Sequence, residues 1–496
     1  NFMSILTARV SYFGNEGQNS EVIVDDWLSL TIKRGLDDKS NTIDIKLKNS
    51  IKRLLADGTV IHKHVNNSKE MSIDGTVALQ QNDVFKIWLR WSNSASDTIT
   101  YDDNSAYMIT IAEVEEWDCS SGEKRSEMTI KCVDKTFEVL NKLWASAYTN
   151  SFGLTCPTMA QLVIRNATDG IPSYVYGYTA AGAYTKPALY GVDARLMGGT
   201  YTQQAALDPV ATGDPPAYIE SKRINNSSYP VIQMTKVWKP VYEWLKEIND
   251  IRNTNTAVEI ASNTPPHDRN NRFYIDQKNR YHQFYPADTV NYDITAGTVD
   301  PDGSVIDFKM TKKTFDIINM VIFNSGKDLN NIGILWYYFD KTSKERKLKM
   351  KYIPMLEIAS EGNGSLRAME AAIGNIQVNS DTTVTILVSA GTTSWGESYS
   401  SAADYKTKFR TKAKYDGSTR AKALVCNRGN PRWKGSFTVK KGSYYAPGQL
   451  CRFTATSHGI NQELVRIGDV MHHVTPSSWT SSLDVEEDEP KYGETI

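Results

Sequence analysis

The stretch GSYYAPGQLCRFTATSHGINQELVRIGDVMHHVTPSSWTSSLDVEE, from Gly442 to Glu487, decides the fold of this chain. Pro447-Gly448 is a turn signal. Apolar and polar residues then alternate with a period of two, pause at 458–461, resume, and alternate again from Trp479 to Val485, which is the pattern of β-strands. The stretch therefore predicts three antiparallel strands that follow one another directly and close a barrel, with Trp479 inside it.

The middle of these strands, expected from Leu464 to Val474, changes its parity once. Its apolar residues up to Ile467 have one parity and those from Val470 onward have the other. A one-residue slip moves every side chain to the opposite face of a sheet. A β-bulge at Gly468-Asp469 would restore a single inward face, so we expect a bulge there.

The order of these motifs resembles the C-terminal signature of phage tail baseplate hub proteins, a group that includes the late control protein D family and the hub half of type VI secretion spike proteins. The resemblance is carried by Pro-Gly and a strand, then RIGDVMHH at 466–473 and WTSSLDV at 479–485. Ser478 departs from the signature, which has glycine before the aromatic position, and any pair of antiparallel hairpins in a barrel has a similar pattern. The structural residues of the motif are Pro447, Gly448, Gly468, His473, Trp479 and Leu483.

Length and composition set further bounds. A chain of 496 residues predicts about three domains, and 40% hydrophobic residues suffice for several cores. A net charge of −1 argues against a nucleic-acid-binding domain, which usually has a basic face. The basic residues at 341–351 alternate as on an exposed strand face.

Five cysteines without Cys-x-x-Cys spacing suit a reducing compartment. No signal peptide and no apolar run of ~18 residues is seen, so stable membrane insertion is not expected.

Residues 1–149 are predicted to form the first tube-like barrel domain. A hairpin with one wet face is expected around 28–48, a strongly apolar strand at 85–91 and a second hairpin at 107–133. At Asp134 the period changes to that of a helix, with Asp134 as its cap and Phe137, Leu140 and Trp144 on one face.

Residues 150–238 are predicted to be a loop-rich insertion domain. A short helix is expected at 157–167, followed by a segment at 170–230 that is rich in Gly, Ala, Tyr and Pro and has little periodicity. So long an irregular segment is usually functional or poorly ordered. Its tyrosines suit contacts with neighbouring proteins and plain packing equally well.

Residues 239–400 are predicted to be a middle α+β domain. Pro240 opens the clearest helix, a hairpin follows at 273–285, and buried strands are expected at 314–324 and 334–339. Residues 401–496 are predicted to form the second tube-like barrel domain, with a helix expected within 400–425 and with strands from 239–400 expected to complete the barrel. The fold class is therefore mainly β with α (α+β): two tail-tube-like β-barrels with flanking helices plus inserted domains.

The sequence has only weak motifs for metal binding or catalysis. His472 and His473 are adjacent on a strand and face opposite ways, so one ion can hardly bind both, and an inward histidine with a hydrogen bond is the better interpretation. His62 and His64 share a face without a carboxylate at ligand spacing. The turn at 300–303 lacks the acidic twelfth residue of a calcium loop, since that position is Thr311. No catalytic, cofactor-binding or metal-binding residue is predicted, and no cofactor.

The resemblance implies a structural virion protein and not an enzyme. It would be the homotrimeric hub of a phage tail tip or baseplate, assembled in the host cytoplasm, that joins a sixfold tail tube or distal tail protein to a threefold central spike. Its channel would pass the tape measure protein and DNA without specific binding. Because Glu486 to Ile496 cannot form a core, we expect a separate spike protein, with the acidic tail as a tether to it. The alternative is a carbohydrate-binding receptor-recognition protein of the tail, because aromatic residues are abundant.

Overall fold

The fold was analysed in a computed structural model. It describes residues 5–15, 21–37, 40–75, 77–92, 101–102, 105–122, 125–134, 137–141, 143–144, 163, 239–250, 272–277, 281–284, 290–296, 305–313, 320–339, 350–353, 366–381, 383–414, 432–440 and 442–488. The predicted helix at 157–167, the tyrosine-rich segment at 170–230, the basic run at 341–349 and the turn at 300–303 lie outside the described residues, apart from Val163.

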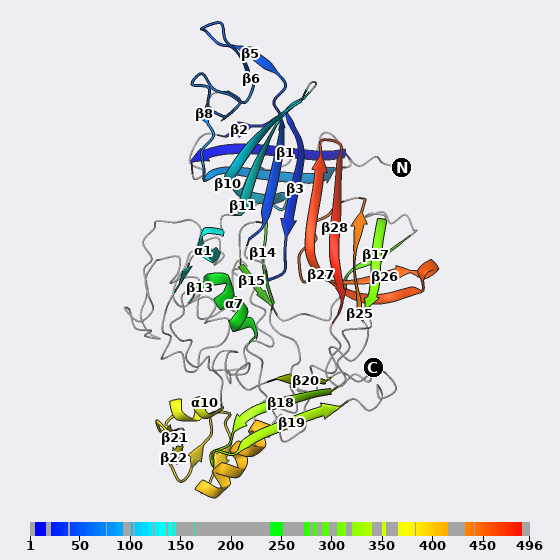
Figure 1. The fold of residues 1–496 in the computed structure, drawn as a ribbon. Coiled ribbons are helices and arrows are strands. Elements are labelled where there is room, and N and C mark those ends of the chain that lie inside the picture. Colours follow the sequence, from blue (N-terminus) through cyan, green and yellow to red (C-terminus); the bar gives the residue numbers. More distant parts are fainter. Residues whose placement is uncertain are drawn as a thin grey trace.

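One curled sheet of 13 strands is the centre of the molecule (Figure 1). Its order is β17-β25-β28-β27-β3-β4-β11-β10-β9-β1-β2, and β26 lies between β27 and β16. The strands are β1 Ile5–Asn15, β2 Val22–Ile23, β3 Trp27–Arg34, β4 Thr42–Lys48, β9 Asp83–Ser92, β10 Met108–Ser121, β11 Ser126–Asp134, β16 Val290–Thr295, β17 Val305–Lys313, β25 Arg432–Val439, β26 Leu450–Ala455, β27 Ile460–Thr475 and β28 Ser478–Glu487.

The first half of the sheet, β1 to β4 with β9 to β11, encloses a core that we call the first core. The alternation seen in the sequence places every second side chain inward: in β4 the buried residues Ile43, Ile45 and Leu47 alternate with Thr42, Asp44, Lys46 and Lys48. Central members of the first core are Val10, Leu30, Ile32, Ile45, Phe85, Ile87, Leu89, Met128 and Ile130.

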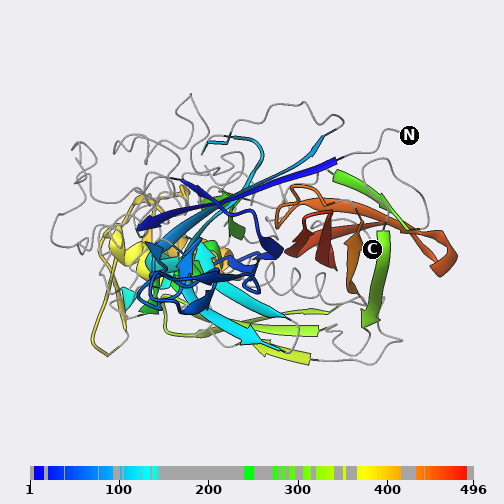
Figure 2. The same cartoon turned by 90° about the horizontal axis from the view of Figure 1, so that it is seen from above.

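The second half, β16, β17 and β25 to β28, encloses the second core, and Figures 1 and 2 show the two halves side by side. β16 and β17 are consecutive in sequence, yet they are the two outermost strands of this half in its ladder. Ile294 of β16 and Phe308 of β17 both contact the second core, so the half is curled. Other members are Phe437, Val439, Cys451, Phe453, Val465, Ile467, Val470, Leu483 and Val485.

The prediction of a mainly β fold with few helices is confirmed. The two expected barrels are two curled halves of one continuous sheet, because the long strand β27 pairs with strands of both halves. Among the residues that the structure describes, no helix has both the length and the hydropathy to cross a membrane.

Residues 49–82 form an arm that projects beyond the first half (Figure 1). Its short hairpins are β5 Lys52–Leu54 with β6 Val60–His62, and β7 Ser72–Ile73 with β8 Val77–Ala78. Asp74 and Gly75, between β7 and β8, have positive φ of 57° and 74°, as residues of a tight turn do. His64 fixes the base of the arm, because its Nε2 lies 2.8 Å from the Asp26 carboxylate.

The prediction that a helix begins at Asp134 is wrong. Asp134 ends strand β11, where its carboxylate accepts a hydrogen bond from the Asn41 backbone N–H at 2.6 Å, so it does not cap a helix. Helix α1 covers only Phe137–Asn141, and Trp144 belongs to β12 (Leu143–Trp144), which pairs with β13 (Lys239–Pro240). Trp144 pairs with Lys239, so these two residues, which are far apart in the sequence, are neighbours in the fold.

Helix α7, Val241–Asp250, begins after Pro240 as predicted and buries Val241, Trp244 and Leu245. The predicted hairpin is also confirmed as β14 Arg272–Ile275 with β15 Tyr281–Phe284. β14 docks on the first half, because Asp37 exchanges backbone and side-chain hydrogen bonds with Phe273 at 2.7 and 2.8 Å.

The described elements between residues 320 and 414 form an inserted unit at the end of the molecule opposite the arm (Figure 1). Its elements are β18 Met320–Lys327, β19 Gly333–Phe339, β20 Met350–Ile353, α10 Leu366–Ala372, β21 Ile376–Val378, β22 Val384–Ile386, β23 Gly391–Thr392, β24 Ser398–Tyr399 and a helix at 402–414. A separate core joins Leu329, Ile376, Trp395, Tyr405 and Phe409. This core runs across residue 400, where the sequence analysis places a domain boundary, because Tyr405 packs against Tyr399.

Candidate functional site

The candidate site is the junction between the two cores, where strand β27 changes its partner. Its first part pairs with β26, as Arg466 does with Leu450, and its last part pairs with β3, as Val470 does with Arg34. Along its other edge β27 pairs with β28, and that register shifts between Ile467 and Val470. The predicted bulge at Gly468-Asp469 is therefore confirmed, and it is also the point where the strand passes from one half to the other.

The bulge keeps the apolar residues of β27 inward, but it divides them between two cores. Val465, Ile467 and Val470 belong to the second core, and Val474 belongs to the first. His472 lies between them and is fully buried, with its Nδ1 2.8 Å from the hydroxyl of the buried Ser481 on β28. A polar pair thus marks the boundary between two apolar cores.

Trp479 belongs to the first core, which corrects the prediction that it lies inside the final barrel. Its side chain is 1% exposed, and its ring stacks on Trp91 of β9 with centroids 6.3 Å apart and planes 7° apart. The hairpin β27–β28 extends past the second half to pair with β3, so its tip reaches the other core. Leu483, further along β28, stays in the second core.

The connection between β25 and β26 returns to the same place and closes the first half against the hairpin. The Trp91 indole N–H donates to the Gly442 carbonyl at 2.9 Å, and the Gly442 N–H donates to the Trp479 carbonyl at 2.7 Å. A Cβ at Gly442 would lie 2.2 Å from the Trp479 ring, so glycine permits this approach. The two adjacent tyrosines contact different halves of the sheet. The Tyr444 hydroxyl donates to the Leu89 carbonyl in the first half, whereas Tyr445 contacts the second core.

Pro447 and Gly448 form the predicted turn before β26. Gly448 has a φ of +85°, a conformation that favours glycine, and its N–H donates to the Ile467 carbonyl at 2.7 Å. The Arg466 guanidinium donates to the Gly448 carbonyl at 2.7 Å and pairs with the Asp488 carboxylate at 2.8 Å. The turn is therefore attached to β27 directly beside the bulge.

Burial lowers the pKa values of the two basic side chains at the junction, Arg34 and His472. Burial lowers the pKa of Arg34 to about 10, while the nearby carboxylates of Asp276 and Asp134 act in the opposite direction. Burial, and then the Arg34 charge, hold the pKa of His472 well below its usual range, so this imidazole is neutral at pH 7. His473 faces the opposite way and is exposed. The two histidines do not converge, as expected from their positions on a strand.

Of the predicted motif residues, Gly448, Gly468 and Trp479 lie at the junction, Leu483 lies in the second core and His473 lies on the exposed face. The sequence analysis missed Arg34, Gly442 and Tyr444. Gly442 and Tyr444 stand in the quoted stretch, but no periodicity marks their partners. In the described part of the chain, no group of three or more His, Cys, Asp or Glu residues could hold a metal ion.

The fold and the junction define a mainly β protein in which one sheet serves two cores. No model of a protein family matches the sequence, and no curated protein matches it. Solved structures do match. The chain is similar to a tail protein from Neisseria meningitidis MC58, with 9% identity, a TM-score of 0.46 and 97% of each chain covered.

The chain is also similar to the 43 kDa tail protein of prophage MuSo2 from Shewanella oneidensis, with 9% identity and a TM-score of 0.49, over 97% of this chain and 98% of that one. An E. coli component of the type VI secretion system matches with 7% identity and a TM-score of 0.38, over 95% and 76% of the two chains.

Proposed function

We propose that the chain is a structural protein of a phage tail or of a phage-derived injection machine, and that it acts as a trimeric hub. The observation that carries the proposal is the junction, where one chain builds two curled sheet halves joined by β27 and β28. Three chains would then present six such halves. A threefold assembly with six related surfaces can match a sixfold tail tube on one side and a threefold spike on the other.

The polar face of the sheet supports a channel. Among the described strands, ion pairs between neighbours lie on this face: Lys33 with Asp469, Lys46 with Glu127, Lys131 with Glu116, Lys434 with Glu486, and Arg452 with Asp293. Paired charges are neutralised locally and are screened in solution. A lining of this kind suits the passage of the tape measure protein and of DNA without a specific binding site.

The first three residues of the acidic tail, 486–488, are less suited to be a tether than the sequence indicates. Glu486 pairs with Lys434, the Glu487 carboxylate accepts a hydrogen bond from the Trp433 N–H at 2.8 Å, and Asp488 pairs with Arg466. These three carboxylates bind within the chain's own sheet. A separate spike protein and a tail tube or distal tail protein remain the proposed partners, with contacts outside 486–488.

The carbohydrate-binding alternative has less support. Sugar sites usually present exposed aromatic rings, but five of the described tryptophans, at positions 27, 88, 244, 395 and 479, are buried, and Trp91, Trp117 and Trp433 are only partly exposed. These rings are used for packing.

The test is the mass of the purified protein by light scattering at increasing concentration, together with a density map of the assembled particle. A trimer whose threefold axis encloses the paired polar face supports the proposal. A chain that is monomeric both in solution and in the particle would contradict it. Binding on a glycan array by a chain that forms no ring would favour the receptor role instead.

A further inference from the structure

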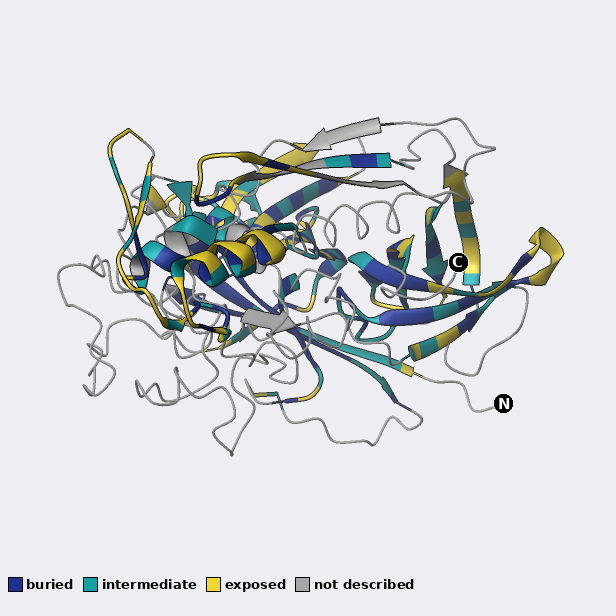
Figure 3. Cartoon of the chain, turned by 90° about the horizontal axis from the view of Figure 1, so that it is seen from below, coloured by how far each residue is buried: buried dark blue, intermediate teal, exposed yellow. Residues whose placement is uncertain are grey.

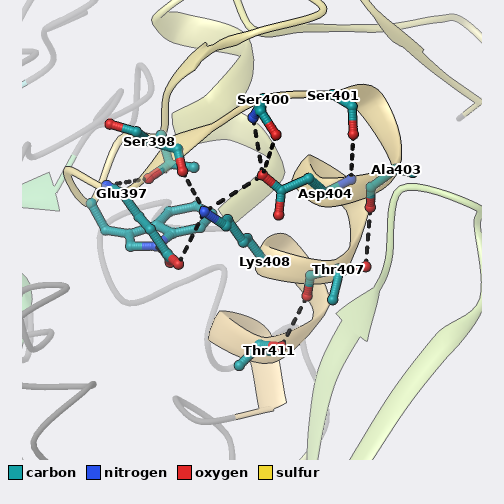
Figure 4. Close-up of polar contacts among 11 residues, drawn as sticks. Glu397, Ser398, Ser400, Ser401, Ala403, Asp404, Thr407, Lys408 and Thr411 are labelled. Atoms are coloured by element: carbon teal, nitrogen blue, oxygen red, sulfur yellow. Dashed lines mark hydrogen bonds and ion pairs between the residues drawn. The ribbon is translucent and has the colours of Figure 1, made fainter.

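The helix at 402–414 of the inserted unit is held in one orientation. Its first turn is capped, since the Asp404 N–H donates to the Ser401 hydroxyl at 3.1 Å and the Asp404 carboxylate accepts from the Ser400 N–H at 3.0 Å (Figure 4). Tyr405 and Phe409, 0% and 1% exposed, pack into the core of the unit. Seen from below, the helix has one buried and one exposed side (Figure 3). Its outer side is therefore fixed toward solvent.

That outer side is basic. Lys406, Arg410 and Lys414 follow one another at spacings of four residues, about 6 Å along a helix, and they are exposed or partly exposed. We call these three residues the basic face. Five of the 13 helix residues are Lys or Arg and one is Asp, which gives +4 in a chain whose net charge is −1. Lys408 pairs with acids of the unit itself, Glu397 at 3.5 Å and Asp404 at 3.6 Å, and the Lys406 ammonium donates to the neutral Asn330 side-chain carbonyl at 2.9 Å.

The residues between the cations restrict the kind of partner. Thr407 and Thr411 are exposed, and each hydroxyl donates to a backbone carbonyl of its own helix, Ala403 and Thr407 respectively (Figure 4). The outer side thus has no aromatic or large aliphatic residue. A protein interface has an apolar or aromatic centre, and a helix that lies in a membrane surface inserts an apolar face. Neither is present here.

The described part of the chain's own acidic tail does not match this face either, because its carboxylates at 486–488 are bound within the sheet. A row of cations that form no ion pair with a carboxylate among the described residues, and that lie beside no apolar anchor, suits a polymer of uniform negative charge. Duplex DNA carries one charge per ~1.7 Å of its axis, so three cations over about 12 Å can each meet a phosphate. We propose that the basic face contacts the phosphate backbone of duplex DNA without reading its sequence.

The experiment compares the full-length protein with the triple variant Lys406→Gln, Arg410→Gln, Lys414→Gln, using a short labelled duplex and fluorescence anisotropy between about 50 and 200 mM salt. The control is Lys46→Gln, Lys131→Gln, Lys434→Gln, which removes the same charge from lysines that are paired on the sheet. Losing three phosphate contacts should weaken binding at least roughly tenfold at low salt and reduce the slope of log K against log salt by about 2.7.

Equal loss in the two variants would show a general charge effect and overturn the proposal, as would wild-type protein that does not bind DNA at low salt. Tighter binding to polyglutamate, or to vesicles of anionic lipid, than to DNA would assign the face to another partner and overturn it too. Unchanged thermal unfolding of each variant shows that the fold is intact. The proposal is independent of the hub function, because the trimer is measured separately by light scattering.

Discussion

The junction and the inserted unit attach a core to the sheet in opposite ways. At the junction, one hairpin serves two cores, since Val470 and Leu483 pack in the second core while Val474 and Trp479 pack in the first. The inserted unit leaves the sheet after Lys313 and returns at Arg432, and these two residues are paired neighbours in β17 and β25. Among the residues that the structure describes, its core shares none with the other two.

This difference predicts which parts of the fold a destabilising substitution will loosen. A change in the hairpin β27–β28 should loosen both halves of the sheet, because either core loses support when the hairpin moves. A change within the inserted unit should stay local, because the unit meets the sheet where one antiparallel pair of strands ends. Cooperative units of this kind are resolved by hydrogen exchange.

Trp479→Ala is expected to have the largest effect. Truncation of a fully buried tryptophan costs on the order of 3–5 kcal/mol, and here it also removes the stack on Trp91. Hydrogen exchange should accelerate in both halves of the sheet. Trp395→Ala, in the core of the inserted unit, is the matched control and should accelerate exchange only within residues 320–414. If both variants accelerated hydrogen exchange over the same regions, the proposed difference between the hairpin and the inserted unit would be contradicted.

Gly435→Ala is expected to cost about 1–3 kcal/mol, because its Cβ would lie 1.9 Å from the Lys309 carbonyl oxygen and would force β17 away from β25. Gly333→Ala in the inserted unit is the control, since nothing lies within 4 Å of a Cβ there. Denaturant unfolding of both variants gives the two free energies. Similar costs at the two positions would contradict the close approach.

Acid should weaken the junction through His472. Its pKa in the folded chain lies well below 6.5, so below about pH 6.5 the unfolded chain binds a proton that the folded chain does not. Stability is therefore complete above that pH and is lost as the pH falls toward the folded pKa, by up to about 1.4 kcal/mol per pH unit. Unfolding should be measured from pH 7 to 5, above the range where carboxylates titrate.

A His472→Gln variant tests the assignment, because an amide does not titrate. Its stability is expected to vary less between pH 7 and 5 than that of the wild type, whatever the cost of the substitution at pH 7. An unchanged pH dependence would show that another group causes it.

Ser401→Ala should have the smallest of these effects, about 1 kcal/mol, because it removes the hydroxyl that accepts the Asp404 N–H at the start of the helix. Thr407→Ala, on the exposed side of the same helix, should change the free energy of unfolding by less than about 0.5 kcal/mol. Melting curves that do not distinguish the two variants would argue against the cap.

The sequence predicted the elements whose cause is local. The bulge at Gly468-Asp469 follows from the parity of neighbouring apolar residues, and the helix after Pro240 follows from its i, i+3, i+4 spacing. The opposite faces of His472 and His473 follow from the geometry of a strand. At Asp134 the same local reasoning failed, because a hydrogen bond to Asn41 extended the strand where the sequence favours a helix cap.

Tertiary structure alone decided which core each residue serves. Trp91 and Gly442 are 351 residues apart, and the strand that follows the bulge pairs with β3 from the first part of the chain. A period of two determines which side chains share a face, but not which strand lies beside it. Trp479 was therefore predicted to be buried but was assigned to the wrong core, since the choice between partners depends on packing free energy summed over distant segments.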